Sequence, residues 1–239
     1  MLEARHLTKR YEGADVPSLD HLDLTVAPGE AFCLLGPNGA GKTTTVNLFL
    51  GFIQPTAGQA LVCGIDAATD PLGARAKLAY IPETVMLYGA LTGLENLAYF
   101  VEVSGLSAPR DDLMALLAAA GLPEAAATRP VRGYSKGMRQ KVGVAIALAR
   151  RAQALVLDEP TSGLDPLAAN EFAALIGRLR GEGLAVLMVT HDLFLAKQCA
   201  TRIGVMAAGR LARVFGAEDV DHLGLERAYL DLFAMGRAA

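Results

Sequence analysis

A glycine-rich stretch that ends in lysine and threonine is the first group of residues whose types and spacing could do chemistry. The stretch GPNGAGKT, residues 36–43, fits the pattern G-x-x-x-x-G-K-[ST] between a strand-like and a helix-like run. Its glycines let successive backbone N–H groups point at phosphate oxygens, and the following helix adds its positive N-terminal end. We expect Lys42 to reach the terminal phosphates of a nucleotide and the Thr43 hydroxyl to bind Mg²⁺. The predicted nucleotide-binding residues of this stretch are Gly36, Pro37, Asn38, Gly39, Ala40, Gly41, Lys42, Thr43 and Thr44.

Two adjacent carboxylates end the apolar run ALVLDEP, residues 154–160. In an open parallel sheet, ligands bind at the carboxyl ends of the strands, so this acidic pair is predicted to lie beside the phosphate loop. Asp158 would hold Mg²⁺, and Glu159 would accept a proton from the attacking water. The alternative is that the two acids only cap the next helix. Two carboxylates in the same chain as a phosphate loop favour the catalytic interpretation.

A single histidine, His191, follows the buried-strand pattern AVLMVT. A lone histidine is more often a structural residue. This one is expected at the same edge of the sheet as the other two motifs, so its position, not its residue type, makes it a candidate for contact with the terminal phosphate.

The stretch GYSKGMRQKV, residues 133–142, joins a serine and two glycines to three basic residues. Ser135 is a good helix N-cap, and the N–H groups of Gly137 and Met138 are expected to be unpaired, which would form a second anion site. A nucleic-acid ligand would require more basic residues along one helix face, with aromatic residues between them. Binding to a membrane surface is disfavoured, because the Val, Ile and Ala residues that follow form a helix face suited to a protein core. The pattern therefore favours a phosphate.

Composition excludes several other classes of protein. The net charge of −3 argues against a chain that coats nucleic acid. Three cysteines, Cys33, Cys63 and Cys199, are far apart and form no CxxC pair, which argues against a disulfide framework or a zinc site. The N-terminus lacks an apolar signal-peptide core, and no run of about 18 apolar residues occurs, so we expect a cytosolic chain. The apolar fraction of 52% leaves a docking face for a hydrophobic partner open.

The elements that must position these residues follow an alternating pattern. Residues 2–35, 59–63 and 78–81 predict strands, and residues 43–50 predict a helix. From about residue 89 to residue 128, the residue pattern is typical of helices. After residue 132, strand and helix alternate again, with Asp165 as an N-cap and Pro166 at the first helical position. Two apolar strands joined by a helix indicate parallel pairing within an α/β fold.

The order of the motifs GPNGAGKTT, YSKGMRQ, LVLDEPTSGLD and THD resembles that of the ATPase subunit of ATP-binding cassette (ABC) transporters. The resemblance implies an α/β fold with a P-loop NTPase core and a mostly parallel sheet, an N-terminal antiparallel β subdomain and an inserted α-helical subdomain at about 84–150. It covers residues 1–216, and a helical tail is expected over residues 217–239, with one helix at 224–236.

The resemblance also implies that two cassettes pair head to tail with two ATP molecules between them. Ser135 and Gly137 would donate hydrogen bonds to the γ-phosphate held by the opposite subunit, and His191 would orient that phosphate and the water. Tyr11 would stack on adenine, although it could equally be a packing residue. The residues implied to contact the opposite nucleotide are Ser135, Lys136, Gly137 and Met138. The residues implied to communicate between the two sites are Ser162, Gly163, Leu164 and Asp165.

Two motifs depart from the usual family pattern. Glu83, in AYIPETV, stands where the family usually carries glutamine, and we predict it as a Mg²⁺ ligand with Thr43 and Asp158, although it adds negative charge beside the phosphates. Lys136 and Met138 stand where many members carry glycine and glutamine. Both changes are similar to the type-2 exporter branch, whose membrane subunits are separate chains.

We therefore expect an ATP- and Mg²⁺-dependent ATPase that powers an exporter from the cytoplasmic face of the cell membrane. Its partners would be a second cassette and an integral membrane permease, and not nucleic acid. One alternative is a soluble cassette that acts on ribosomes or DNA. Such proteins resemble two fused cassettes or a cassette split by a long coiled coil, and this chain has neither pattern. A degenerate cassette that only signals is disfavoured because Lys42, Asp158, Glu159 and His191 are all present.

Overall fold

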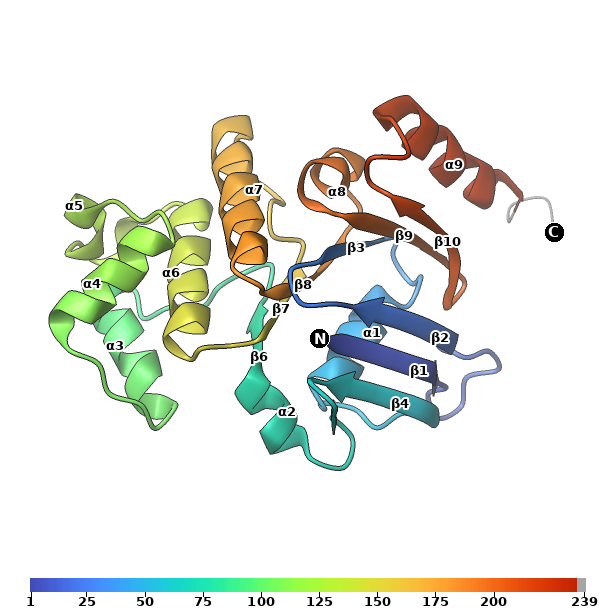
Figure 1. Ribbon diagram of the computed structural model, residues 1–239, viewed down its shortest axis with the longest axis horizontal. Coiled ribbons are helices and arrows are strands. Elements are labelled where there is room, and N and C mark those ends of the chain that lie inside the picture. The colour runs from blue at the N-terminus through green and yellow to red at the C-terminus, as the bar shows by residue number, and fades with distance from the viewer. Residues whose placement is uncertain (236–239) are drawn as a thin grey trace.

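Two β-sheets and a group of helices at one end of the larger sheet make up the protein (Figure 1). The computed structural model describes residues 1–235. The smaller sheet is antiparallel, with the strand order β2-β1-β4-β5. Its strands are β1 (Leu2–Lys9), β2 (Leu19–Val26), β4 (Ala57–Val62) and β5 (Ile65–Asp66). This sheet is the N-terminal antiparallel subdomain that the family resemblance implies, so that prediction is confirmed.

The larger sheet has the strand order β10-β9-β3-β8-β7-β6. All of its neighbouring strands pair in parallel except the edge strand β10, which is antiparallel to β9. Its strands are β3 (Ala31–Leu35), β6 (Leu78–Ile81), β7 (Ala154–Asp158), β8 (Ala185–Thr190), β9 (Arg202–Ala207) and β10 (Arg210–Gly216). The mostly parallel sheet expected from the sequence is therefore confirmed.

Both faces of the larger sheet are covered, which explains why its central strands are apolar throughout. In β3, Phe32 and Leu34 face the smaller sheet and α1 (Lys42–Phe49), whereas Cys33 and Leu35 face the other helices. The same alternation runs through β7 and β8. A strand buried on both sides cannot carry polar residues along its length, so polar side chains concentrate where the strands end.

The helix α7 (Pro166–Gly181) connects β7 to β8 and begins as the sequence predicts. The Asp165 side chain accepts a hydrogen bond from the Ala168 backbone N–H at 2.9 Å, and Pro166 occupies the first turn. This crossover makes β7 and β8 parallel neighbours, so it brings the acidic pair and His191 to one edge.

The helical insert lies beyond β6 and forms one end of the molecule in Figure 1. A capping box formed by Thr92 and Glu95 starts its first helix. Leu97, Leu117 and Val142 from three of its helices are fully buried together. Its helices are α3 (Gly93–Val103), α4 (Arg110–Ala119), α5 (Glu124–Ala127), the 3₁₀ turn η1 (Val131–Gly133) and α6 (Lys136–Ala149).

Several elements were not predicted from the sequence, namely α2 (Pro71–Lys77), α8 (Leu193–Cys199), β9 and β10. The helix α2 carries an Asp70 N-cap and a proline in its first turn, which are start signals that could have identified it. The expected tail helix is present as α9 (His222–Met235), and the last residue of the predicted range, 236, lies outside the described residues. Within residues 1–235, the helices are too short or too polar to cross a membrane.

Candidate nucleotide-binding site

Four adjacent parallel strands end at the same edge of the larger sheet, and a predicted motif follows each of them. The phosphate loop follows β3, His191 follows β8, the acidic pair ends and follows β7, and Glu83 follows β6. Strand pairing keeps these ends nearly level, with Leu35 opposite Thr190 and Asp158 opposite Val189. The structure therefore brings the predicted residues of these four motifs together along one line.

The phosphate loop is packed so closely that two of its glycines cannot carry a side chain. Gly41 has φ of 105°, and a Cβ there would lie 2.6 Å from the Ser18 backbone oxygen. A Cβ on Gly36 would lie 2.7 Å from the Met206 backbone oxygen. The loop is thus fixed between β9 and the segment before β2, which presets its curved backbone for an anion.

The last two residues of the motif, Lys42 and Thr43, differ in exposure. The Lys42 ammonium is buried and donates hydrogen bonds to the backbone oxygens of Gly36 and Pro37, the latter at 3.0 Å. Burial lowers the pKa of Lys42, and the nearby negative charges of Glu159 and Asp158 oppose this change. The Thr43 side chain is exposed at the start of α1, where its hydroxyl is free to meet a ligand.

Glu159 is held in one orientation by the end of the neighbouring strand. Its backbone has φ of 45°, a left-handed conformation that is unusual for a glutamate, and its N–H donates to the Val189 backbone oxygen at 2.8 Å. The Thr190 hydroxyl donates to Glu159 Oε2, and His191 Nδ1 lies against Oε1, both at 2.8 Å. Thr190 is a positioning residue that the sequence analysis missed.

Asp158 is a half-buried carboxylate whose side chain accepts a single hydrogen bond from residues 1–235. The Tyr80 hydroxyl donates to its Oδ2 at 3.3 Å. Burial raises the pKa of Asp158, and after it the charges of Glu159 and Glu83 act in the same direction, against the hydrogen bond from Tyr80. Burial, together with Asp158, raises the pKa of Tyr80 to about 12. Tyr80 was also missed, although it is the one polar side chain in the run LAYI.

The donor set suits Mg²⁺ held jointly with a nucleotide. Thr43 offers an exposed hydroxyl and Asp158 a carboxylate with unused lone pairs. Within residues 1–235, no three histidine, cysteine or acidic side chains cluster as a preformed metal cage. Mg²⁺ is commonly bound through one or two protein groups plus phosphate oxygens and waters, so these residues fit it.

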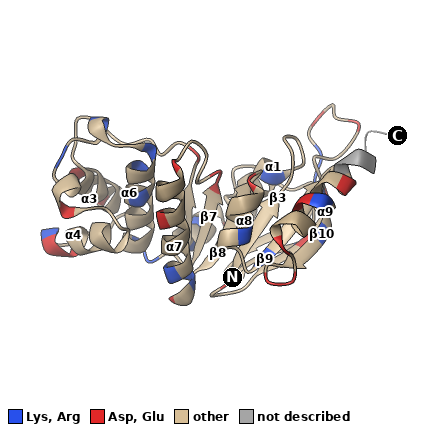
Figure 2. Cartoon of the chain, turned by 90° about the horizontal axis from the view of Figure 1, so that it is seen from above, with Lys and Arg blue, Asp and Glu red and all other residues tan. Residues whose placement is uncertain are grey.

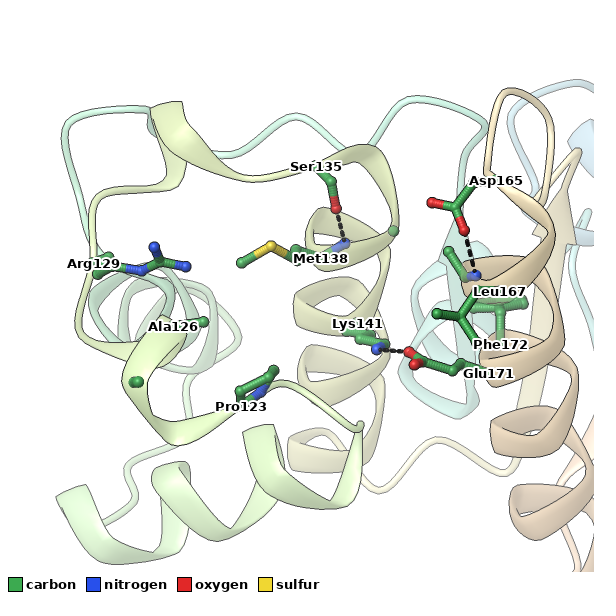
Figure 3. Close-up of a pocket in the computed structure, with 13 residues that line it drawn as sticks. Pro123, Ala126, Arg129, Ser135, Met138, Lys141, Asp165, Leu167, Glu171 and Phe172 are labelled. Carbon is green, nitrogen blue, oxygen red and sulfur yellow. Dashed lines mark hydrogen bonds and ion pairs between the residues drawn. The ribbon is translucent and has the colours of Figure 1, made fainter.

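The stretch YSKGM, residues 134–138, which corresponds to the signature of the family that the sequence resembles, leads into α6, with Ser135 as its N-cap, as predicted. Ser135 Oγ accepts a hydrogen bond from the Met138 N–H at 3.3 Å, so that N–H is not unpaired and the expectation for it is wrong. A pocket of about 500 Å³ opens beside Ser135, between α5, α6 and α7 (Figure 3). Its walls also carry Gly137, Met138 and Asp165.

The loop at residues 162–165 packs against the start of α6. A Cβ on Gly137 would lie 3.5 Å from Leu164. Lower on the same helix, the fully buried Gln140 donates from Nε2 to the Pro160 backbone oxygen, and its Oε1 has no hydrogen-bond partner among the described residues. The signature helix is therefore attached to the segment that follows the acidic pair.

Glu83 contacts both the signature helix and that segment. Its Oε1 accepts a hydrogen bond from the Ser162 hydroxyl at 3.0 Å and from the Lys136 ammonium at 3.4 Å. The hydrogen bond from Ser162 and the charge of Lys136 lower the pKa of Glu83. These contacts join residues 53 and 79 positions apart in the chain.

Tyr11 lies in the loop between β1 and β2 and is 40% exposed. The Lys9 ammonium lies 5.2 Å from the centre of its ring, a cation–π distance. Its exposed ring is compatible with stacking on a base, and the assignment to adenine stays a prediction.

A glycine-rich loop between β3 and α1, with carboxylates at the end of β7, the second parallel strand along from β3, defines a P-loop nucleotide-binding domain. The ABC transporter family profile matches residues 19–162, more than half of the chain. The chain belongs to the ABC transporter family as one of its ATP-binding cassettes, and its nucleotide is ATP.

Similar proteins include transporter subunits and isolated cassettes. YbhF of Escherichia coli K12, a probable multidrug ABC transporter ATP-binding protein, is 38% identical over 88% of this chain, which spans only 36% of that protein. The fluoroquinolones export ATP-binding protein Rv2688c of Mycobacterium tuberculosis H37Rv is 38% identical over 88% of this chain and 69% of its own length. The dimeric cassette MJ0796 bound to ADP and phosphate has a TM-score of 0.79 at 26% identity, over 91% of this chain and 99% of that one.

Proposed function

We propose that this chain hydrolyses ATP to power an exporter, through ATP-driven pairing of two cassettes on a separate membrane permease. The observation that supports ATP hydrolysis is the fixed orientation of the Glu159 carboxylate. It is held by Thr190 and His191, which lie at the end of β8, the strand between that of Glu159 and that of the phosphate loop. The direction of transport follows the two relatives named for multidrug transport and fluoroquinolone export.

Each residue of the site has a chemical role in this proposal. The backbone N–H groups of the phosphate loop and Lys42 bind the β- and γ-phosphates. Thr43, Asp158 and Glu83 would hold Mg²⁺, which supplies positive charge to the phosphate oxygens when bound. Glu159 accepts the proton of the attacking water, and His191, within contact of Glu159 Oε1, orients the water and the γ-phosphate.

The position of the signature supports its action on a second cassette. Lys136 contacts Glu83, which follows β6, whereas the phosphate loop follows β3, three strands away. Among the described residues, the walls of the pocket beside Ser135 include no residue of the phosphate loop. The pocket beside Ser135 leaves room for the nucleotide of a partner cassette. The loop at residues 162–165 packs on the start of α6, so it would couple pairing of the two cassettes to Asp158 and Glu159.

A groove between the core and the helical insert is the proposed contact for the permease. It measures about 630 Å³ and its exposed apolar residues are Phe52, Leu72, Val103 and Leu106. Tyr80 also lines the groove, and its hydroxyl donates to Asp158, so only the Tyr80 side chain would separate a helix docked there from this predicted Mg²⁺ ligand. Exposed apolar side chains around a groove are typical of a helix-binding surface.

Charge distribution supports a protein partner. Figure 2 shows the positions of lysine and arginine scattered over many elements and interspersed with acidic positions, without a continuous basic stretch along a described helix. Nucleic-acid binding would require such a stretch. We therefore place the cassette, over residues 1–216 with the helical subdomain at about 84–150, against a permease at the cytoplasmic face of the cell membrane.

The permease contact can be tested by substitution within the groove. We expect Val103→Glu with Leu106→Glu to abolish co-purification of a multi-span membrane subunit in mild detergent, because a carboxylate cannot be buried against an apolar helix without a partner. ATP hydrolysis by the isolated chain should stay within about two-fold of the parent, since surface changes away from the site have small effects.

The matched control is Leu223→Glu, because the exposure of Leu223, 62%, lies between those of Val103, 67%, and Leu106, 44%, but Leu223 lies on α9. Capture of the same multi-span subunit by the control and by the groove variant alike would rule out the groove as the contact.

A further inference from the structure

Two of the three positions that depart from the usual family pattern, Glu83 and Lys136, are in contact through one carboxylate oxygen. Both Lys136 and Ser162 donate to Oε1 of Glu83, at 3.4 and 3.0 Å. Within residues 1–235, Oε2 of the same carboxylate takes part in no hydrogen bond or ion pair that reaches another protein group. The carboxylate is therefore held on one side only.

A glutamine at position 83 could not accept hydrogen bonds from Lys136 and Ser162 through one terminal atom and bind a cation through the other. Its single oxygen would be required by the two donors, and its other terminal atom would be an N–H group, which repels a cation. A glutamate bound through Oε1 instead presents a second oxygen with free lone pairs. Asp158 ends β7, and Glu83 follows the neighbouring strand β6, with Ile81 opposite Leu157.

We propose that Lys136 and Ser162 are positioning residues for Glu83, holding its Oε1 so that Oε2 would stay available to the Mg²⁺ that Asp158 would hold. The chain thereby combines a charged metal ligand with a contact from its own signature helix and its own 162–165 loop. This inference rests on the proposed nucleotide site. It adds that the start of α6 acts on Mg²⁺ affinity within its own chain, besides any contact it makes with a partner cassette.

Positioning and simple charge make opposite predictions for removal of Lys136. Loss of a positive charge makes the site more negative, so charge alone predicts tighter Mg²⁺ binding. If Lys136 positions Glu83, its loss frees the half-exposed carboxylate to leave the metal, and Mg²⁺ binding weakens. The sign of the change therefore separates the two accounts.

The test measures ATP binding to the full chain by calorimetry in EDTA and across a magnesium titration. We expect Lys136→Gln to raise the Mg²⁺ concentration for half-maximal tightening by about two- to five-fold, in the range of a partly exposed ion pair. ATP affinity in EDTA should not change. Glu83→Gln should raise this Mg²⁺ concentration at least as much. The double variant should raise it no more than Glu83→Gln alone, because Lys136 is proposed to act only through its contact with Glu83.

Two further variants control for charge and folding. Lys136→Arg keeps the contact and should keep the parental Mg²⁺ dependence. Lys141→Gln removes another cation of α6, one whose contact is Glu171 at 2.7 Å, and should also leave it unchanged. Circular dichroism verifies that each variant is folded.

The positioning role is overturned if Lys136→Gln tightens or does not change Mg²⁺ binding, or if its effect adds fully to that of Glu83→Gln. A parent chain that binds no ATP even with Mg²⁺ would instead overturn the proposed function itself. The two failures are thus distinguishable in the same titration.

Discussion

Glu159→Gln is expected to reduce ATP turnover by 10²- to 10⁴-fold, the usual contribution of a general base. The amide keeps the size of the side chain and can still accept the hydrogen bond from Thr190. It cannot take a proton from water. Steady-state phosphate release measures the loss, and calorimetry with ATP should show an affinity within about three-fold of the parent, because only the transition state loses an interaction.

A matched control for this substitution is Glu226→Gln, an exposed carboxylate on α9 that has no place in the proposed site. Its turnover should equal that of the parent. Undiminished hydrolysis by Glu159→Gln would show that Glu159 is not the general base. Loss of ATP binding would show that the substitution disturbs the phosphate loop instead.

Mixing two inactive variants is expected to restore activity if the signature acts on the opposite nucleotide. Lys42→Ala removes the loop cation but leaves the signature intact, and Ser135→Arg does the reverse. In a mixed pair, the loop of one chain meets the signature of the other, which gives one complete site. With random pairing half of the pairs are mixed, so the rate should reach at most about a quarter of that of the parent.

The control for the mixture combines Ser135→Arg with the double variant Lys42→Ala/Ser135→Arg, in which no pair has a complete site. That mixture should stay inactive. Absence of recovery in the first mixture would place the signature on its own nucleotide, and recovery of two sites in each mixed pair would refute the cross-subunit contact.

The edge of the sheet at which the site lies could be predicted from the sequence because local patterns determine it. Apolar runs ending in Asp158 and preceding His191, joined by a helix capped by Asp165, specify parallel neighbours with their carboxyl ends together. The phosphate loop is likewise a local pattern between a strand and a helix. These features required no knowledge of which distant segments touch.

Contacts that depend on strand order and register could not be predicted in that way. Thr190 reaches Glu159 because β8 lies beside β7, and Tyr80 reaches Asp158 because β6 lies on its other side. The left-handed backbone of Glu159 contradicts residue preference, since tertiary contacts impose it. The contact joins Glu83, before the helical insert, to Lys136 at the start of its last helix. The two residues are 53 positions apart in the chain, so only the folded chain reveals the contact.

The mass of the Glu159→Gln chain in saturating ATP and Mg²⁺ is the most direct test of the central claim that two cassettes enclose two nucleotides. Blocked hydrolysis should trap the closed pair, because ATP then holds the loop of one chain against the signature of the other. Analytical ultracentrifugation is predicted to give twice the mass of one chain with ATP, and a single chain with ADP. A chain that stays single in saturating ATP would contradict the account.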